Sequence, residues 1–116
     1  MQVKVVGVCG SGKSTLVERL RARGFDARQI SQEHSYVPDL WLRFGEEPSI
    51  LVYLEASLGT VRDRLGKSGF TPWMFREQEA RLAHAREHAD IVVRTDGLTP
   101  EEVADEVVRR ITELSG

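Results

Sequence analysis

The sequence has only one cysteine, Cys9, and no apolar run of transmembrane length. A lone cysteine cannot form an internal disulfide bond, which favours a reducing compartment. An apolar, strand-like segment follows Met1 directly, so we also expect no signal peptide. Together these absences predict a cytoplasmic protein that does not contact a membrane.

An excess of charge of one sign is also lacking. The chain has 16 basic and 18 acidic residues, a net charge of −2 and a pI near 5.9. This balance provides no long-range attraction to nucleic acid or to acidic lipids, so we expect neither as a partner. Repeats, low-complexity tracts and linkers are absent too. With 116 residues and 41% hydrophobic content, the sequence predicts one globular domain over residues 1–116.

Near its start the chain contains a glycine-rich run that matches the pattern G-x-x-x-x-G-K-[ST] at every fixed position. The run is Gly7-Val8-Cys9-Gly10-Ser11-Gly12-Lys13-Ser14. Glycines let successive backbone N–H groups curl inward around phosphate oxygens. Lys13 would reach the β- and γ-phosphates, and the Ser14 hydroxyl would bind Mg²⁺. The run therefore predicts a phosphate-binding loop for a nucleotide, and the amino end of the following helix adds positive charge.

The segments on either side of this run decide between a nucleotide site and an ordinary turn. Residues 2–6 are rich in valine and predict a buried strand. From Ser14 onward, apolar residues such as Leu16 and Leu20 recur at helical spacing, and Gly24 is a natural end for the helix. A strand before the run and a helix after it are the context that a phosphate-binding loop requires.

Beyond this run, strand-like and helix-like segments alternate, which is typical of an α/β sheet with helices on its faces. We expect strands at 25–31, 49–54 and 89–94, helices at 57–66, 72–88 and from 99 onward, and a loop with one short helix at 32–48. The last helix opens with the capping box Thr99-Pro100-Glu101-Glu102 and should bury Val103, Val107, Ile111 and Leu114. The prediction is a three-layer fold around about four mostly parallel strands.

Three stretches, in this order, resemble the small P-loop kinases of the shikimate, gluconate and nucleotide kinase group. They are GVCGSGKSTL, ILVYLEASLGTVRDRL and HADIVVRTDGLTPEEVADEVVRRI. The resemblance implies the P-loop NTPase fold, in a shortened form. It also implies ATP-dependent phosphoryl transfer with Mg²⁺, and GTP is the alternative nucleotide.

The resemblance also gives roles to individual residues. Arg64 matches an arginine that precedes a mobile lid, the lid corresponds to 66–75, and Arg76 lies just beyond it. Planar guanidinium groups can bond two oxygens of a phosphoryl group in transfer, although both arginines can equally be surface charges. The expected catalytic residues are Lys13, Arg64 and Arg76. The expected nucleotide contacts are Gly7, Cys9, Gly10, Ser11, Gly12, Lys13, Ser14 and Thr15, with the turn Thr95-Asp96-Gly97 lining the adenine pocket.

The interval between Ser31 and Ser49 departs from that group, whose members have a substrate-binding section there and a further strand that ends in an acid. The resemblance therefore does not identify the acid that assists Mg²⁺, and we choose among three candidates by their positions relative to the sheet. Glu55 ends an apolar strand, and Asp39 has the place of a helix start after Pro38. We favour Glu33 as the second metal-associated residue beside Ser14, because it follows a strand at the carboxyl edge of the sheet.

Two functions remain open from the sequence. The first is a kinase that transfers the γ-phosphoryl group to a small acceptor bound near 33–41, and the second is a nucleotide-dependent switch or slow NTPase without an acceptor. Either can be a monomer or a homodimer. The string His84-Ala85-Arg86-Glu87-His88 fits the H-x-x-E-H pattern of zinc peptidases, but such a site needs another protein ligand and a larger scaffold. We interpret these histidines as exposed helix residues.

Overall fold

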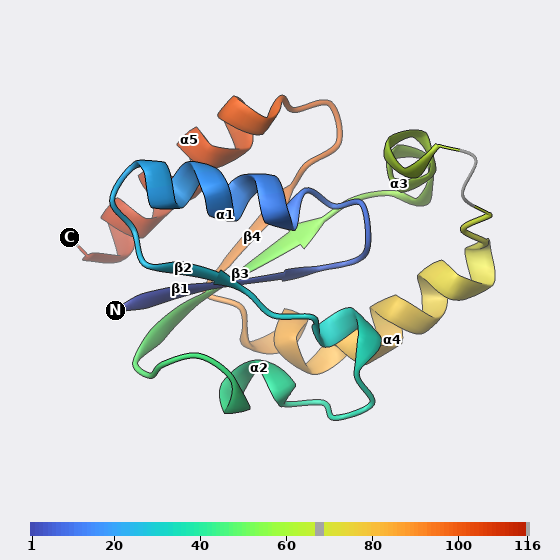
Figure 1. Cartoon of the computed structure of the whole chain (residues 1–116), viewed down its shortest axis with the longest axis horizontal. Coiled ribbons are helices and arrows are strands. Elements are labelled where there is room, and N and C mark those ends of the chain that lie inside the picture. Colours follow the sequence, from blue (N-terminus) through green and yellow to red (C-terminus); the bar gives the residue numbers. More distant parts are fainter. Residues whose placement is uncertain (67–68, 116) are drawn as a thin grey trace.

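The centre of the fold is a four-stranded parallel sheet, seen in a computed structural model that describes residues 1–66 and 69–115 (Figure 1). The strands are β1 (Gln2–Gly7), β2 (Ala27–Gln29), β3 (Ser49–Glu55) and β4 (Ile91–Arg94), in the order β2-β1-β3-β4. Every pairing is parallel. The predicted α/β fold with about four parallel strands is confirmed.

Alternation along the two central strands divides the apolar residues between two cores. In β1, Val3 and Val5 belong to one core and Val6 to the other. In β3, Val52 joins the first core and Leu51 the second, so both faces of these strands are buried. Near-continuous apolar runs are what parallel strands covered on both faces require.

Helices α1 (Lys13–Ala22) and α5 (Pro100–Ser115) cover the first face of the sheet (Figure 1). The predicted capping box is confirmed, because the Thr99 N–H donates to Glu102 Oε1 at 2.9 Å and the Glu102 N–H donates to Thr99 Oγ1 at 3.1 Å. The predicted burial of Leu114 is wrong: its side chain is 56% exposed. Ile111 is the last buried residue of α5, and Leu114 falls in the final turn.

The second face is covered by α4 (Pro72–His88) together with three short elements. These are a 3-10 turn, η1 (Gln32–His34), and the helices α2 (Leu40–Arg43) and α3 (Leu58–Leu65). Figure 1 shows α2 and α4 on the opposite side of the sheet from α1 and α5. No strand lies between Ser31 and Ser49, an interval that the structure describes in full. Within the described ranges, each helix is too short or too polar to cross a lipid bilayer.

Buried polar side chains hold the segment between β2 and β3 against the sheet. Lys4 points into the second core with no exposed area, donates to the Trp41 carbonyl at 2.9 Å and pairs with Glu47. Gln32 is also fully buried, and its Oε1 accepts from the Trp41 N–H at 3.0 Å. These bonds fix the backbone around Trp41, whose ring completes the core. Phe44, which follows α2, is by contrast 49% exposed.

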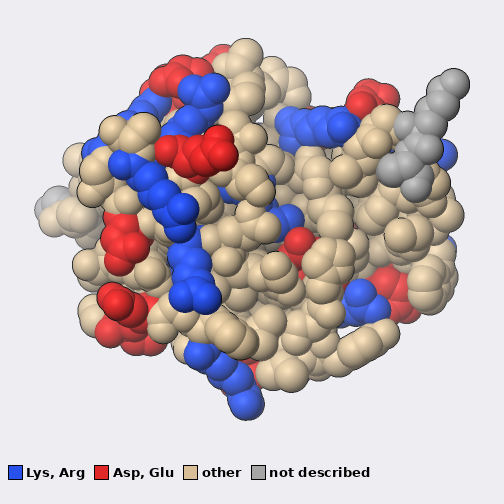
Figure 2. Space-filling model, viewed as in Figure 1, with Lys and Arg blue, Asp and Glu red and all other residues tan. Residues whose placement is uncertain are grey.

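Basic side chains form a row across the face over α1 and β2, and acidic side chains lie beside it (Figure 2). Arg23, at the end of α1, bonds Glu101 at 2.5 Å and Asp105 at 2.7 Å, both on α5. Arg19 pairs with Glu101 as well. These exposed pairs connect α1 to α5 and partly neutralise the row, although exposed pairs contribute little to stability.

Candidate functional site

The glycine-rich loop, residues 7–14, connects β1 to α1 at the carboxyl edge of the sheet. Gly10 and Gly12 have φ angles of +76° and +99°, which residues with a Cβ rarely adopt. A Cβ at Gly7 would lie 2.6 Å from Ser11 Oγ and 2.7 Å from the Leu54 carbonyl oxygen. The loop therefore requires glycine at these three positions for its own geometry.

Several backbone donors in this loop have no partner within the described residues. No hydrogen bond there uses the N–H groups of Gly10, Gly12, Lys13 or Ser14. Gly12 precedes α1 without a side-chain cap, so the first N–H groups of a ten-residue helix stay open. An uncapped helix start of this kind favours the binding of an anion, because its N–H groups carry partial positive charge.

Lys13 lies buried beneath the loop and carries the strongest charge interaction of the site. Its Nζ donates to the carbonyl oxygens of Gly7 and Val8, both at 2.9 Å. The same Nζ forms an ion pair with Glu33 Oε2 at 2.9 Å, and the two side chains are 6% and 3% exposed. Because isolated charges are costly to bury, Lys13 and Glu33 need each other in this position.

Two buried oxygens of the same region make no hydrogen bond with the described residues. They are Ser11 Oγ in the loop and Glu33 Oε1 in η1. Unsatisfied buried polar atoms are uncommon and destabilising, so their concentration around one loop indicates a site for a polar ligand or ion.

The three acids that the sequence offered as partners of Mg²⁺ occupy different places. Glu33 contacts Lys13 of the loop. Glu55 instead bonds Arg86 at 3.1 Å and Arg94 at 3.3 Å. Asp39 stands at the start of α2, where it bonds Arg43 at 3.1 Å. The structure thus brings Glu33, and neither of the others, against the loop lysine.

Two glutamines that sequence reasoning missed also contact the loop. The Ser14 hydroxyl donates to Gln29 Oε1 at 2.8 Å, on the exposed side of the loop at the end of β2. Gln78 of α4 is buried, and its Oε1 accepts from the Cys9 N–H at 2.9 Å. Neither glutamine belongs to a sequence motif, and only the packing of β2 and α4 brings them to the loop.

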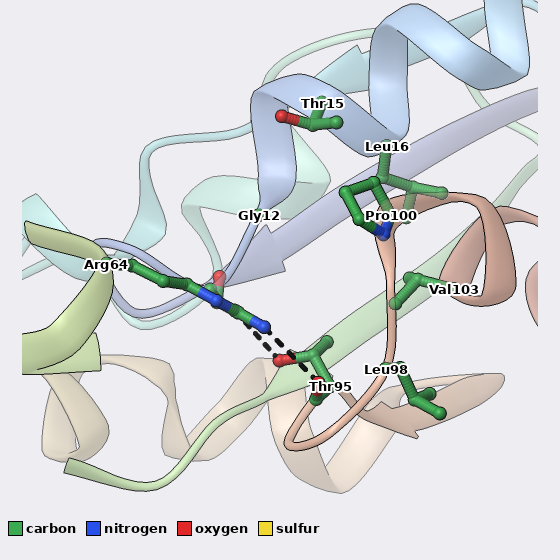
Figure 3. A pocket seen from close by; sticks show the side chains of 9 residues that line it. Gly12, Thr15, Leu16, Arg64, Thr95, Leu98, Pro100 and Val103 are labelled. Atoms are coloured by element: carbon green, nitrogen blue, oxygen red, sulfur yellow. Dashed lines mark hydrogen bonds between the residues drawn. The ribbon is translucent and has the colours of Figure 1, made fainter. Parts of the chain in front are cut away.

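Arg64 of α3 connects the loop to the turn after β4, as the dashed bonds in Figure 3 show for Thr95. Its Nη1 donates to the Gly10 carbonyl and to Thr95 Oγ1, each at 3.1 Å, and its Nη2 donates to the Thr95 carbonyl at 3.2 Å. Arg76, by contrast, is exposed on α4 and makes no hydrogen bond or ion pair with the described residues. The expected lid includes Lys67 and Ser68, which lie outside those residues.

A cavity of about 290 Å³ opens beside Arg64, between the start of α1 and the start of α5 (Figure 3). Apolar side chains supply much of its wall, and polar groups come from the loop and the turn after β4. The lining residues are Ser11, Gly12, Thr15, Leu16, Arg64, Thr95, Leu98, Pro100 and Val103. Four of the predicted nucleotide contacts, Ser11, Gly12, Thr15 and Thr95, therefore face one cavity together with Arg64. Leu98, Pro100 and Val103 were not foreseen as part of it.

Asp96 and Gly97 follow Thr95 but are not among the residues that line this cavity. Asp96 Oδ1 accepts from the Ser57 N–H at 3.0 Å and from the Ser57 hydroxyl at 3.2 Å. The Ser57 N–H, followed by the Thr60 hydroxyl, holds the pKa of the Asp96 carboxyl below its ordinary value of 3.8. Asp96 thus fixes the start of α3, the helix that presents Arg64.

The two histidines of the H-x-x-E-H string differ in environment, which corrects part of the prediction. His88 is exposed, but His84 is half-buried and its Nδ1 accepts from Trp41 Nε1 at 3.0 Å. The rings stack with centroids 4.2 Å apart. His84 is unavailable to a metal through Nδ1, because that atom already bonds the tryptophan that covers the second core.

Comparison with known proteins finds no matching family model and no matching curated protein. The fold and the site together define a class of protein. It is an α/β protein with a parallel sheet, in which a glycine-rich loop at the carboxyl edge of the sheet holds a buried lysine. The resemblance to small kinases stays a prediction, so the function must be argued from the residues of this chain.

The lowered pKa of Asp96 leads to a prediction for acid stability. An aspartate whose pKa is lower in the folded state stabilises the fold above its unfolded pKa, and the contribution is lost as pH falls through the folded value. Between about pH 5 and pH 2, Asp96→Asn should therefore lose less free energy of unfolding than the wild type. Urea unfolding across this interval measures the difference, and equal losses in both proteins would contradict the prediction.

Proposed function

We propose that the protein binds a nucleoside triphosphate with Mg²⁺ at the glycine-rich loop and transfers the γ-phosphoryl group to a small acceptor. ATP is the expected nucleotide and GTP the alternative. One observation carries the proposal: the uncapped start of α1 leaves loop N–H groups without partners among the described residues, and the buried Lys13 bonds the carbonyls of the same loop. Such a combination of donors and positive charge suits phosphate oxygens.

The resemblance to the shikimate, gluconate and nucleotide kinase group agrees with this proposal. In that comparison the loop corresponds to the Walker A segment of a P-loop NTPase, and the four parallel strands to a shortened form of that fold. The sheet order β2-β1-β3-β4 leaves the loop of β1 in a central position, with strands on both sides. Ligands in open parallel sheets bind at this carboxyl edge.

The residues around the loop fit a magnesium ion. The Ser14 hydroxyl is exposed and held by Gln29, and Glu33 has a buried oxygen without a hydrogen bond among the described residues. Hydroxyl and carboxylate oxygens are ligands that Mg²⁺ prefers, either directly or through water. When bound there, Mg²⁺ would reduce the negative charge of the phosphates.

Lys13 and Arg64 supply the positive charge that phosphoryl transfer requires. In the structure, both bond carbonyl oxygens of the loop, so both already lie at the place where we propose the phosphates bind. Exchanging these carbonyl partners for phosphate oxygens would give each cation an anionic acceptor in place of a neutral one. Arg76 is the proposed third cation and would have to approach with the segment that precedes α4.

The cavity between α1 and α5 has the character of a base-binding site. Leu98, Pro100 and Val103 offer an apolar wall, and the Thr95 region offers polar groups at one edge. Its volume of about 290 Å³ is at the lower end of small-ligand cavities, which suits a single base better than a complete nucleotide. A base placed there would leave its phosphates directed toward Gly12 and the start of α1.

A second cavity, of about 410 Å³, supports the proposed position of the acceptor. It lies between the segment 35–38 and α4, and its lining includes Tyr36, Arg81 and His84. Arg81 Nη1 donates to the Glu33 carbonyl at 3.3 Å, so this cavity adjoins η1, whose Glu33 side chain contacts Lys13. We propose that the acceptor binds here, within the predicted interval 33–41.

A nucleotide-dependent switch or slow NTPase is the second candidate function. The absence of a strand between Ser31 and Ser49 favours it, because the interval holds only η1 and α2. The two candidates share the nucleotide site and differ in the need for an acceptor, so one assay separates them.

Replacing Lys13 tests the nucleotide site. Lys13→Ala removes the ammonium group beneath the loop and should weaken productive Mg-ATP binding by at least about tenfold. It also leaves Glu33 buried without its partner, so the free energy of unfolding should fall while the chain stays folded. ADP release from Mg-ATP measures turnover, with circular dichroism as the check on folding. Arg109→Ala, an exposed change on α5, is the matched control and should behave as the wild type.

The same assay is run with and without a pool of nucleosides, nucleotides and small hydroxylated metabolites. Turnover that needs both Lys13 and the pool is the kinase outcome. Tight binding of Mg-ATP with slow ADP release that is the same with and without the pool would favour the switch. Unchanged affinity and turnover in Lys13→Ala would refute the nucleotide site in either form.

Arg64 allows a separate test of phosphoryl transfer. Arg64→Ala should lower turnover by about 10²-fold, because its guanidinium group is proposed to stabilise charge on the transferred group. Arg62→Ala, two residues earlier on the same helix and exposed, is the control and should keep wild-type turnover. Equal turnover in the two variants would show that Arg64 serves only to join α3 to Thr95.

A further inference from the structure

The glycine-rich loop and η1 bring together three side chains of different chemistry. Cys9 Sγ lies 3.5 Å from His34 Nε2, and that same nitrogen lies 3.7 Å from Glu33 Oε2. All three potential ligand atoms are within 4.8 Å of one another. A thiol, an imidazole and a carboxylate at one point form a donor set that metal ions recognise.

The separations between these atoms suit a tetrahedral zinc ion. With ordinary bond lengths, zinc holds its sulfur and nitrogen ligands about 3.5 Å apart and its nitrogen and oxygen ligands about 3.4 Å apart. The corresponding distances in this cluster are 3.5 Å and 3.7 Å. Two of the three separations therefore already suit a bound ion, and the third, between the ligand atoms of Cys9 and Glu33, lies within 4.8 Å.

Glu33 provides an independent sign that a cation belongs at this position. Its side chain is 3% exposed, and the Oε1 atom makes no hydrogen bond with the described residues. Lys13 pairs with Oε2, the oxygen that lies 3.7 Å from His34 Nε2, and Oε1 of the same carboxylate is the open acceptor among the described residues. An ion would therefore share Oε2 with Lys13 or bind Oε1 after the carboxylate rotates. A buried carboxylate oxygen without a donor is costly, and a bound cation would remove that cost.

Gln78 and access from solvent complete the surroundings of the cluster. Gln78 Nε2 donates to Cys9 Sγ at 3.3 Å and holds the sulfur in place. His34 is 59% exposed and Cys9 is half-buried, so the cluster can be reached from solvent. The site therefore combines access for an ion with a buried anchoring carboxylate.

We propose that Cys9, Glu33 and His34 form a binding site for a soft divalent transition-metal ion of the Zn²⁺ type. The three protein ligands leave a fourth position for water or another ligand. Binding replaces the thiol proton of Cys9, which passes to solvent. Thiolate and imidazole distinguish this site from one for Mg²⁺, which prefers oxygen ligands. Glu33 is also the proposed partner of Mg²⁺, so the two ions would compete for its carboxylate, and the transition-metal site is tested without nucleotide and without Mg²⁺.

Cobalt(II) is the probe, because a cysteine thiolate bound to Co²⁺ gives a charge-transfer absorption band. Titrating the nucleotide-free protein with Co²⁺ should produce this band, and Zn²⁺ should displace it. Cys9→Ser should lose the band, and His34→Ala should weaken Co²⁺ binding by at least about tenfold. Thermal unfolding checks that both variants fold.

One further variant separates this site from the histidine pair on α4. His88→Ala removes the exposed member of that stacked pair and should leave the band unchanged. The proposal is overturned if the wild type gives no thiolate band, or if His34→Ala binds Co²⁺ as the wild type does. Loss of nucleotide binding in Lys13→Ala has no bearing on it.

Discussion

Burial of the Lys13 ammonium group is the interaction on which the rest of the site depends. Its bonds to the Gly7 and Val8 carbonyls fix the curve of the loop, and its ion pair with Glu33 holds η1 against that loop. A charge this far from water must have such partners, so β1, α1 and η1 cannot be arranged independently. The same ion pair fixes the position of the Glu33 side chain as well as that of Lys13.

This arrangement leaves a defined set of groups without partners, and both proposals start from them. The open N–H groups at the start of α1 are electropositive and suit phosphate, whereas Glu33 Oε1 suits a cation. The two faces of the sheet have different roles around this edge. The core under α1 and α5 borders the proposed base cavity. On the other face, helix α4 carries Gln78 and Arg81 and lines the proposed acceptor cavity.

Much of the fold was predictable because its signals are local. The apolar run 50–54 gives a central strand, and the Thr99 to Glu102 box starts α5. Leu114 shows what helical spacing cannot predict. The spacing of apolar residues indicates which face of a helix is buried, but not at which residue the helix extends past the core. The position of Glu33 at the carboxyl edge was also predictable from strand order, whereas its ion pair with Lys13 was not.

The rest of the site depends on contacts between distant segments. Gln29 and Gln78 bond the loop, yet an uncharged amide has no spacing pattern that marks it in a sequence. The cluster of Cys9 with His34 forms only because η1 packs beside the loop. Likewise, Val103 was predicted only as a buried helix residue and Leu98 was not singled out, and only the packing of α5 against α1 makes them walls of a cavity. Such features require the tertiary structure.

The central claim is that the open N–H groups of the loop bind the phosphates of a nucleotide. Its most direct test is the amide NMR spectrum of the ¹⁵N-labelled protein during titration with Mg-ATP. The account predicts saturable shifts that are largest at Gly10, Gly12, Lys13 and Ser14, with smaller shifts at Thr95 and Leu98. A loop whose amide signals stay unchanged at millimolar Mg-ATP, or shifts confined to other parts of the chain, would contradict it.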